Sequence, residues 1–260
     1  MKQLFVVKIG GHVIDDPQRL RQFLYDFVAL QGHKILVHGG GKIATETGKR
    51  MGLESVYVAG RRVTDADTLR LVTMVYGGLV NKEIVALLQG AGANAIGLTG
   101  ADGNLMKAVK RPVAGIDYGY VGDIQQGGVN TGLLSVLTEN NMLPVLAPLT
   151  HDGEGSMLNT NADTIAQEVA VAMSSAYQVQ LIYCFEKQGV LRDPEDETSV
   201  IPDIRKDDFK RLKIAGAITN GMIPKLDNAF AAFSAGVQQV IIGQANEIRA
   251  LIAGEAGTKI

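Results

Sequence analysis

The sequence has one cysteine, almost no net charge and no long apolar run. Cys184 stands alone, which excludes an intramolecular disulfide and fits a reducing compartment. The formal net charge of −2 leaves no basic surface for nucleic acid and no electrostatic attraction to an anionic membrane. No apolar run approaches membrane-spanning length, and Lys2 and Lys8 are atypical of a signal peptide. These absences predict a soluble cytoplasmic protein that binds neither nucleic acid nor membranes.

What the sequence does contain is an alternation of strand-like and helical segments. With 260 residues, 46% of them hydrophobic, the chain can bury the core of one large α/β domain or two fused lobes. Strands are expected at residues 4–9, 34–38, 93–98, 143–147, 179–184 and 238–242, with hairpins at 55–63 and between 105–109 and 118–124. Helices are expected at residues 17–31, from 41 onward, and at 65–89, 131–140, 163–174, 202–213, 221–235 and 246–253. The alternation predicts a three-layer αβα sandwich around a mainly parallel open sheet.

A run of three glycines follows the predicted strand at 34–38. Gly39, Gly40 and Gly41 let the backbone take positive φ and bring its N–H groups close to a ligand. A helix pattern begins directly behind them, and a helix N-terminus favours an anion such as phosphate. A tight turn without a ligand explains one such glycine run equally well. A second glycine turn in the chain would therefore favour an anion-binding site over a simple turn.

That second turn lies at the end of the first predicted strand. Lys8 stands inside the apolar segment 4–9, directly before Gly10 and Gly11. A lysine in such a strand is costly to bury unless it meets a negative partner, so we expect Lys8 to face an anion site. The alternative is a solvated lysine on an edge strand, which its apolar neighbours disfavour.

Three further polar features have two interpretations each. Asp163 closes the segment 159–163, which is too polar for a strand, and it either caps a helix or takes part in chemistry. Lys225 stands at a predicted helix start, where a solvated lysine is the commoner explanation. Arg61 and Arg62 at the predicted hairpin are either solvated or clamp an anion, because a guanidinium group suits a bidentate grip on a carboxylate.

Seven short motifs, taken in their order along the chain, resemble the amino acid kinase family over essentially the whole length. They are Val7-Lys8-Ile9-Gly10-Gly11, Val37-His38-Gly39-Gly40-Gly41, Gly60-Arg61-Arg62-Val63-Thr64, Gly97-Leu98-Thr99-Gly100 with Asp102-Gly103, Tyr120-Val121-Gly122-Asp123-Ile124, Asn159-Thr160-Asn161-Ala162-Asp163, and Thr219-Asn220-Gly221-Met222-Ile223-Pro224-Lys225. Each motif is weak alone, but seven in the family's order are specific. The resemblance implies a single amino acid kinase domain over 1–260. Its N-terminal lobe, about 1–150, would bind an acyl-amino acid and dimerise, and its C-terminal lobe, about 151–260, would bind ATP.

The resemblance also implies a role for individual residues. Lys8 and Lys225 would flank the transferring phosphoryl group, and Asp163 would hold the two lysines, so these three are the expected catalytic residues. The expected substrate-binding residues are Gly40, Gly41, Arg62 and Asn159. The expected nucleotide-binding residues are Lys8, Gly10, Gly11, Glu186, Gly189 and Lys225. ATP and Mg²⁺ are the implied cofactors, with no metal ligand assigned to the protein.

The chemistry of the implied reaction agrees with these residue types. The acceptor would be the side-chain carboxylate of an N-acyl-glutamate, whose pKa of about 4 leaves it ionised at neutral pH, so no general base is required. The difficulty is to bring this anion to the γ-phosphate of ATP and to stabilise the charge on the transferred group. Lysines, glycine N–H groups, a helix dipole and Mg²⁺ serve that purpose. The products would be an acyl phosphate and ADP.

The chain departs from the family pattern in one place. Residues 184–191 read Cys-Phe-Glu-Lys-Gln-Gly-Val-Leu where Leu-Thr-Asp-Val-x-Gly-Val-Leu is usual, so Phe185 replaces a small hydroxyl residue and Glu186 replaces an aspartate. Nucleotide affinity and base recognition therefore stay open. The acyl group also stays open, because acetyl is the family default and succinyl, or another acidic amino-acid derivative, is the alternative.

Other functions would use many of the same residues. Glutamate 5-kinases, aspartokinases, carbamate kinases and uridylate kinases share the lysines and glycines, but the hairpin with Arg62 and its spacing to Asn159 favour an N-acyl amino acid. An alternative of another class is a regulatory module that binds nucleotide or amino acid without catalysis. The joint presence of Lys8, Asp163 and Lys225 argues against that module.

The resemblance generates a prediction about assembly. Arginine-inhibited members of the family carry an additional N-terminal helix that joins dimers into a hexameric ring. Here three residues precede the first predicted strand, fewer than the roughly 12 to 15 that a marginally stable helix needs. The predicted helix at 65–89 is apolar around most of its circumference and offers a surface for a two-fold partner. We expect a homodimer that arginine does not inhibit.

Light scattering should give the mass of a dimer, and millimolar arginine should leave the KM for the acyl-glutamate unchanged. A hexamer mass, or a KM raised several-fold by arginine, would contradict this expectation.

Overall fold

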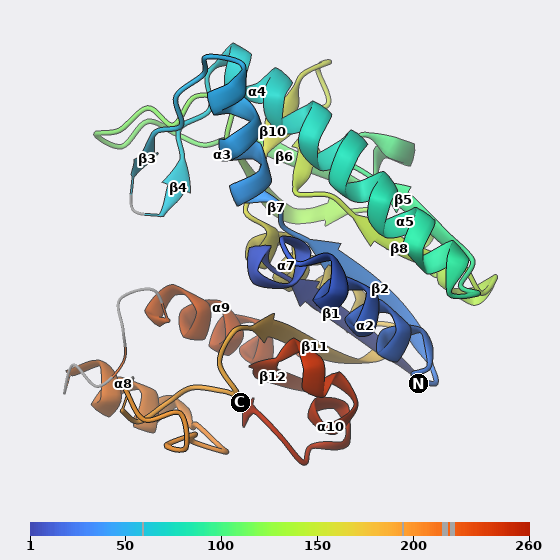
Figure 1. The fold of residues 1–260 in the computed structure, drawn as a ribbon, viewed down its shortest axis with the longest axis vertical. Helices are drawn as coiled ribbons and strands as arrows, with labels where there is room; N and C mark the ends of the chain where they lie inside the picture. Colours follow the sequence, from blue (N-terminus) through green and yellow to red (C-terminus); the bar gives the residue numbers. More distant parts are fainter. Residues whose placement is uncertain (59, 194, 215–217, 219–221) are drawn as a thin grey trace. The chain divides into compact units, whose positions relative to one another are not determined.

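The computed structural model describes residues 1–58, 60–193, 195–214, 218 and 222–260. The chain forms two compact units. The first unit contains Met1–Lys34 and Ala166–Ile260, and the second contains Ile35–Ile165 (Figure 1). The chain therefore starts the first unit, builds the whole second unit and then returns to complete the first. The predicted division into functional lobes at about residue 150 is a separate proposal and stays a prediction.

The first unit is built on four strands in the order β13-β12-β11-β1. They are β1 (Lys2–Ile9), β11 (Tyr177–Phe185), β12 (Gln239–Gln244) and β13 (Thr258–Lys259). The first three strands are parallel and β13 is antiparallel to β12. The register pairs Lys8 with Tyr183 and Ile9 with Cys184. The carboxyl ends of β1 and β11 are therefore neighbours, and the residues that follow them meet at one edge of the sheet.

Helices of the first unit flank these strands (Figure 1). They are α1 (Gly11–Ile14), α2 (Pro17–Val28), α8 (Lys206–Ile214), α9 (Ile223–Ser234) and α10 (Ile248–Ala253), with a 3₁₀ turn at Ala245–Glu247. Asp16 caps α2, accepting from the backbone N–H groups of Gln18 at 2.9 Å and Arg19 at 3.2 Å. The helix ends at Val28 rather than at residue 31, and Gly32 follows with φ of 109°, which a right-handed helix cannot accommodate.

The second unit contains the parallel strands β2-β8-β5 and a second sheet in the order β10-β9-β6-β7. Their bounds are β2 (His33–His38), β5 (Ala95–Leu98), β6 (Met106–Lys110), β7 (Gly122–Val129), β8 (Leu143–Leu146), β9 (Leu149–His151) and β10 (Met157–Asn159). A two-stranded hairpin of β3 (Tyr57–Val58) and β4 (Arg61–Arg62) completes the unit, as the sequence predicts. The hairpin of β6 and β7 also forms, although β7 extends to residue 129.

One local prediction in this unit is wrong. Asn159 belongs to a segment that we expected to be too polar for a strand, yet it ends β10, where it pairs with Leu149. Its backbone N–H also donates to the carbonyl of Tyr120 at 2.9 Å. Pairing with the neighbouring strand β9 and with Tyr120 therefore overrides the low strand propensity of asparagine.

The helices of the second unit are α3 (Gly41–Arg50), α4 (Ala66–Val72), a π-helix (Thr73–Val80), α5 (Asn81–Gly90) and α6 (Thr131–Glu139). A 3₁₀ turn covers Asp102–Asn104, and α7 (Ala162–Met173) begins in this unit and ends in the first. Asp65 caps α4, accepting from the N–H of Thr68 at 2.8 Å.

The segment Ala66–Gly90 is one long helix interrupted by π-helical turns. It is the one helix among the described residues that is long and apolar enough to cross a membrane, a property that the core helix of a soluble protein can share. Its apolar side chains Val72, Val75, Val80, Ile84 and Leu88 are buried, and α5 packs on β5 and β8. These contacts identify the segment as the core helix of a folded unit.

Candidate functional site

A cavity of about 180 Å³ lies in the second unit. Its walls come from the glycine run 39–41, the β3–β4 hairpin, the π-helix and the segment 159–162. No acidic side chain is among the described residues that line it. The cavity contains the four predicted substrate-binding residues, Gly40, Gly41, Arg62 and Asn159.

The glycine run forms the start of α3. Gly40 precedes the helix with φ of 145°, and a Cβ atom at this position would lie 3.1 Å from Cδ1 of Tyr76. Both the backbone conformation and the close approach therefore require glycine. No side chain in the described part of the chain caps α3, so the N–H groups of its first turn remain available to a ligand at the cavity wall.

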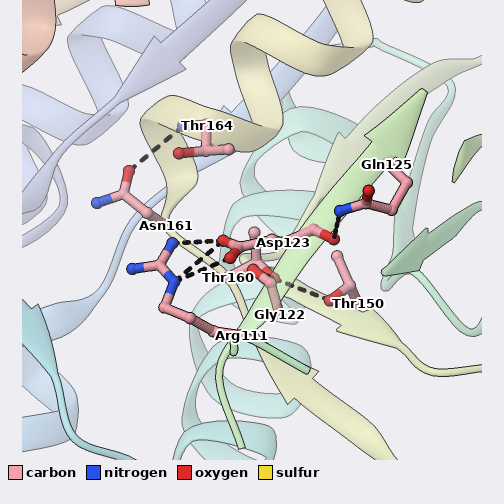
Figure 2. Close-up of polar contacts among 8 residues, drawn as sticks. All are labelled: Arg111, Gly122, Asp123, Gln125, Thr150, Thr160, Asn161 and Thr164. Carbon is pink, nitrogen blue, oxygen red and sulfur yellow. Dashed lines mark hydrogen bonds and ion pairs between the residues drawn. The ribbon is translucent and has the colours of Figure 1, made fainter. Parts of the chain in front are cut away.

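The N-terminus of α7 forms another part of the cavity wall. Asn161 caps this helix, because its Oδ1 accepts from the N–H groups of Asp163 at 2.8 Å and Thr164 at 3.3 Å. Figure 2 shows Asn161 turned toward this first helical turn. The alternative interpretation of Asp163 as the helix cap is therefore wrong, because the cap lies two residues earlier. Two helix N-termini thus point their positive ends at one cavity, which favours an anionic ligand.

Arg62 is the most firmly held charged residue of the cavity. Its side chain is only 6% exposed. The guanidinium donates to the carbonyl of Gly41 and to Oγ1 of Thr45, both at 2.9 Å, and to Ser55 Oγ and the Tyr57 hydroxyl. It also lies over the ring of Tyr57, 4.7 Å from the centroid. These contacts join α3 to the hairpin and fix a positive charge beside the glycine run.

The segment behind Asn159 is positioned by a chain of hydroxyl contacts. Asn159 Nδ2 donates to Oγ1 of Thr64 at 3.0 Å. The next residue, Thr160, donates through Oγ1 to the carbonyl of Gly122 at 3.1 Å and lies 2.8 Å from Oγ1 of Thr150 (Figure 2). All three threonines are buried, so the backbone that leads into α7 is held in place.

A second arginine lies beside this segment. Arg111 forms a bidentate contact with Asp123, with Nε 3.0 Å from Oδ2 (Figure 2). This hydrogen bonding raises the pKa of Arg111. Burial, followed by the nearby charge of Arg111, lowers the pKa of Arg61, which lines the cavity. Arg61 is partly buried, whereas Arg62 is almost fully buried.

Tyr76 is a cavity residue that the sequence analysis missed. It stands in the π-helix, is 6% exposed and packs against the glycine run. Burial raises the pKa of its hydroxyl. Insertions of π-helical turns often occur at functional sites, because they redirect side chains. The adjacent pair Gly77-Gly78 was the available signal for an irregular helix.

The predicted phosphate-side lysines come together in the first unit. Lys8, at the end of β1, is 7% exposed, and its Nζ lies 5.7 Å from the ring centroid of Phe185. Lys225, in the first turn of α9, places its Nζ 3.5 Å from the same centroid. Gly10 and Gly11 follow Lys8 at the start of α1. The two ammonium groups therefore lie near one aromatic ring, and their expected place on either side of the transferring phosphoryl group stays a prediction.

A cavity of about 400 Å³ adjoins this ring in the first unit. Phe185, Glu186, His12, Arg19 and Gln244 are among its lining residues. The side chain of Glu186 is mostly exposed and lies 3.7 Å from Nδ1 of His12. The cavity therefore combines an apolar wall with both signs of charge.

Gly189 and Asp163 complete the predicted set. A Cβ atom at Gly189 would lie 2.7 Å from Oγ1 of Thr258, so close packing explains the glycine. Asp163 stands in the first turn of α7, whose N-terminus lines the cavity of the second unit. The contact of Asp163 with the two lysines and the nucleotide contact of Gly189 stay predictions. The motif residues 219–221 lie outside the described residues.

Residues 3–244 match the amino acid kinase family. The chain belongs to this family. Acetylglutamate kinase of Phocaeicola vulgatus is 56% identical over 247 residues, which are 95% of each chain. Acetylglutamate kinase of Cytophaga hutchinsonii is 57% identical over 253 residues, or 97% of this chain and 95% of the relative. Acetylglutamate kinase of Bacteroides fragilis strain ATCC 25285 is 54% identical over 259 residues, which are 100% of this chain and 97% of the relative.

Solved structures agree on the fold. N-acetylglutamate synthase from Neisseria gonorrhoeae, complexed with coenzyme A and N-acetyl-glutamate, superposes with a TM-score of 0.82 at 22% identity, covering 100% of this chain and 59% of that one. Carbamate kinase from Giardia lamblia bound to AMP-PNP superposes with a TM-score of 0.69 at 14% identity. The match covers 100% of this chain and 98% of that one. The predicted αβα architecture with a mainly parallel sheet is confirmed.

The glycine run also depends on a buried histidine. His38 is fully buried directly before it, and its Nδ1 lies 2.7 Å from the carbonyl of Gly39. Its Nε2 lies 3.1 Å from Nδ2 of Asn81, which also donates to the carbonyl of Val145 at 3.0 Å. Nδ1 must therefore carry the proton and Nε2 must accept, so the neutral ring fits this network.

We expect the stability of the fold to depend on His38 at acid pH. Burial lowers the pKa of His38 from 6.5 to about 4. Below pH 6.5 the unfolded chain takes up a proton that the folded chain excludes. Stability is therefore full above pH 6.5 and falls by on the order of 3 kcal/mol as the pH falls to about 4.

Urea unfolding at several pH values would measure this effect. His38→Gln should flatten the loss of stability between pH 6.5 and 4. The prediction would be contradicted if the free energy of unfolding fell equally with pH in His38→Gln and in the natural protein.

Proposed function

We propose that this protein transfers the γ-phosphoryl group of ATP to the side-chain carboxylate of N-acetyl-L-glutamate, a step of arginine biosynthesis. The observation that carries the proposal is the cavity of the second unit, where two helix N-termini and the buried Arg62 surround a space without acidic lining in the described residues. Such a site suits a small dianion. The family membership and the three acetylglutamate kinases that are 54–57% identical support the same reaction.

The site residues provide binding and charge stabilisation. The acceptor carboxylate is already ionised at neutral pH, so it attacks phosphorus directly and no proton has to be removed. Arg62, Asn159 and the N–H groups at Gly40 and Gly41 would hold the acyl-glutamate. Lys8 and Lys225 would stabilise the negative charge on the transferred group, and Asp163 would hold these two lysines. The products are the acyl phosphate and ADP.

Mg²⁺ is expected to accompany ATP. Within the described residues, no group of three or more His, Cys, Asp or Glu side chains could hold a metal ion. Mg²⁺ commonly keeps several waters and binds mainly to substrate phosphates, so we expect the nucleotide to carry the ion into the site. When bound, the ion would neutralise part of the phosphate charge.

We also infer a homodimer in the cytoplasm. Met74 and Leu79 on the segment Ala66–Gly90 are 53% and 46% exposed, which offers an apolar strip for a second copy. Among the described residues Cys184 is a buried free cysteine, and burial raises the pKa of its thiol to about 12.

A coupled assay of ADP release would test the proposed reaction. N-acetylglutamate, N-succinylglutamate, glutamate and aspartate should be compared as acceptors, with N-acetylglutamate expected to give the highest kcat/KM. Higher kcat/KM with N-succinylglutamate would replace the acetyl group in the proposal by succinyl. Binding of nucleotide without turnover on any acceptor would favour the regulatory module instead.

Lys8→Met should lower kcat by at least about a hundredfold, because it removes one charge that stabilises the transition state. The control Lys2→Met changes an exposed lysine at the other end of the same strand and should leave kcat unchanged. Thermal unfolding would verify that both variants fold. Turnover of Lys8→Met near that of the natural protein would remove Lys8 from the catalytic set.

Arg62→Lys should mainly raise the KM for the acyl-glutamate and hardly alter the KM for ATP. Lysine keeps the charge but loses the planar fork that contacts Gly41 and Thr45. The control Arg50→Lys lies at the exposed end of α3 and should leave both values unchanged. If the KM for ATP rose instead, Arg62 would belong to the nucleotide side.

Asp163→Asn should remain folded and lose most activity. Asn161 provides the cap of α7, so the substitution removes no cap, whereas the two lysines would lose their expected carboxylate partner. Asp67→Asn is a matched control, because Asp67 also stands in the first turn of a helix. A collapse of the melting temperature of Asp163→Asn, together with its activity, would assign Asp163 a structural role.

A further inference from the structure

Phe185 ends strand β11 at the edge where the two predicted phosphate-side lysines converge. Its ring stacks parallel to that of Tyr183, with centroids 6.2 Å apart and an interplanar angle of 6°. Tyr183 is 1% exposed and lies next to Lys8 in the register of β1 and β11. The ring of Phe185 therefore rests on a buried neighbour at the end of a central strand, which limits its movement.

Two ammonium groups lie over this one ring. Nζ of Lys225 is 3.5 Å from the centroid and Nζ of Lys8 is 5.7 Å from it, both within the range of a cation–π contact. Like charges that share a small site repel one another. The negative face of an aromatic ring attracts both groups without adding a net charge or a hydrogen-bond acceptor that would compete for them.

We propose that Phe185 is a positioning residue that holds the ammonium groups of Lys8 and Lys225 at the phosphoryl-transfer site. The inference rests on the proposed function, because it assumes that the two lysines act on the transferred phosphoryl group. Phe185 itself acts through the lysines.

Two substitutions separate the ring from its apolar bulk. Phe185→Tyr retains the π face, whereas Phe185→Leu retains an apolar side chain but removes the ring. Phe185→Leu should lower kcat roughly tenfold, with both KM values within about twofold of the natural protein, and Phe185→Tyr should restore most of the loss. The control Phe233→Leu makes the same change at a half-exposed position of α9 and should leave kcat unaltered.

Three kinetic outcomes would overturn the proposal. One is an unchanged kcat in Phe185→Leu. Another is an equal loss in Phe185→Tyr and Phe185→Leu when both melt at the natural temperature. The third is a raised KM for ATP at constant kcat, which would mean that the ring stacks on the nucleotide.

A measurement without substrate tests the contact directly. In protein labelled with ¹³C-lysine, the ε-CH₂ proton signals of Lys8 and Lys225 should lie upfield of the other lysines, because of the ring current of Phe185. Lys8→Arg and Lys225→Arg assign the two signals. The upfield shifts should persist in Phe185→Tyr and disappear in Phe185→Leu, and ordinary shifts in the natural protein would overturn the proposal.

The two kinds of failure are distinguishable. A natural protein that turns over none of the acceptors would overturn the proposed function, while the NMR signals would still decide whether the ring holds the lysines. A natural protein that turns over N-acetylglutamate, together with an unaffected Phe185→Leu variant, would overturn only the positioning role.

Discussion

The buried guanidinium of Arg62 is the contact on which the cavity of the second unit depends. It reaches the first turn of α3 through Gly41 and Thr45 and the hairpin through Ser55 and Tyr57, so one side chain fixes the glycine run relative to the β3–β4 hairpin. These four hydrogen-bond acceptors of the buried guanidinium are neutral oxygens. A buried cation supported only by dipoles has high affinity for an anion, and this explains how one residue can both build the cavity and define its ligand.

The glycine run and the π-helix form one complementary surface. Gly40 needs its positive φ, and the space beside it is taken by Tyr76, which the π-helical turns bring to the cavity. Behind the run, His38 and Asn81 satisfy one another inside the core. The N–H groups that face the cavity are thus supported from behind by a fully buried polar network, which is the arrangement that preorganised anion binding requires.

Charge is handled differently in the first unit. Lys8 and Lys225 meet over Phe185, and the cavity beside this ring also contains Glu186 and Arg19. The aromatic ring attracts both ammonium groups without adding a further charge to the site.

The sequence by itself determined the features that depend on neighbours along the chain. These are the alternation of strands and helices, the caps Asp16 and Asp65, the hairpin with Arg62, and the two glycine turns, because periodicity, capping and glycine conformation are local properties. Only the tertiary structure decided which side chains meet. It assigned the cap of α7 to Asn161, paired Asn159 into a strand, brought Tyr76 to Gly40 and placed Phe185 beneath two lysines. Each of the last three joins residues far apart in sequence, and packing between distant segments overrides local preference.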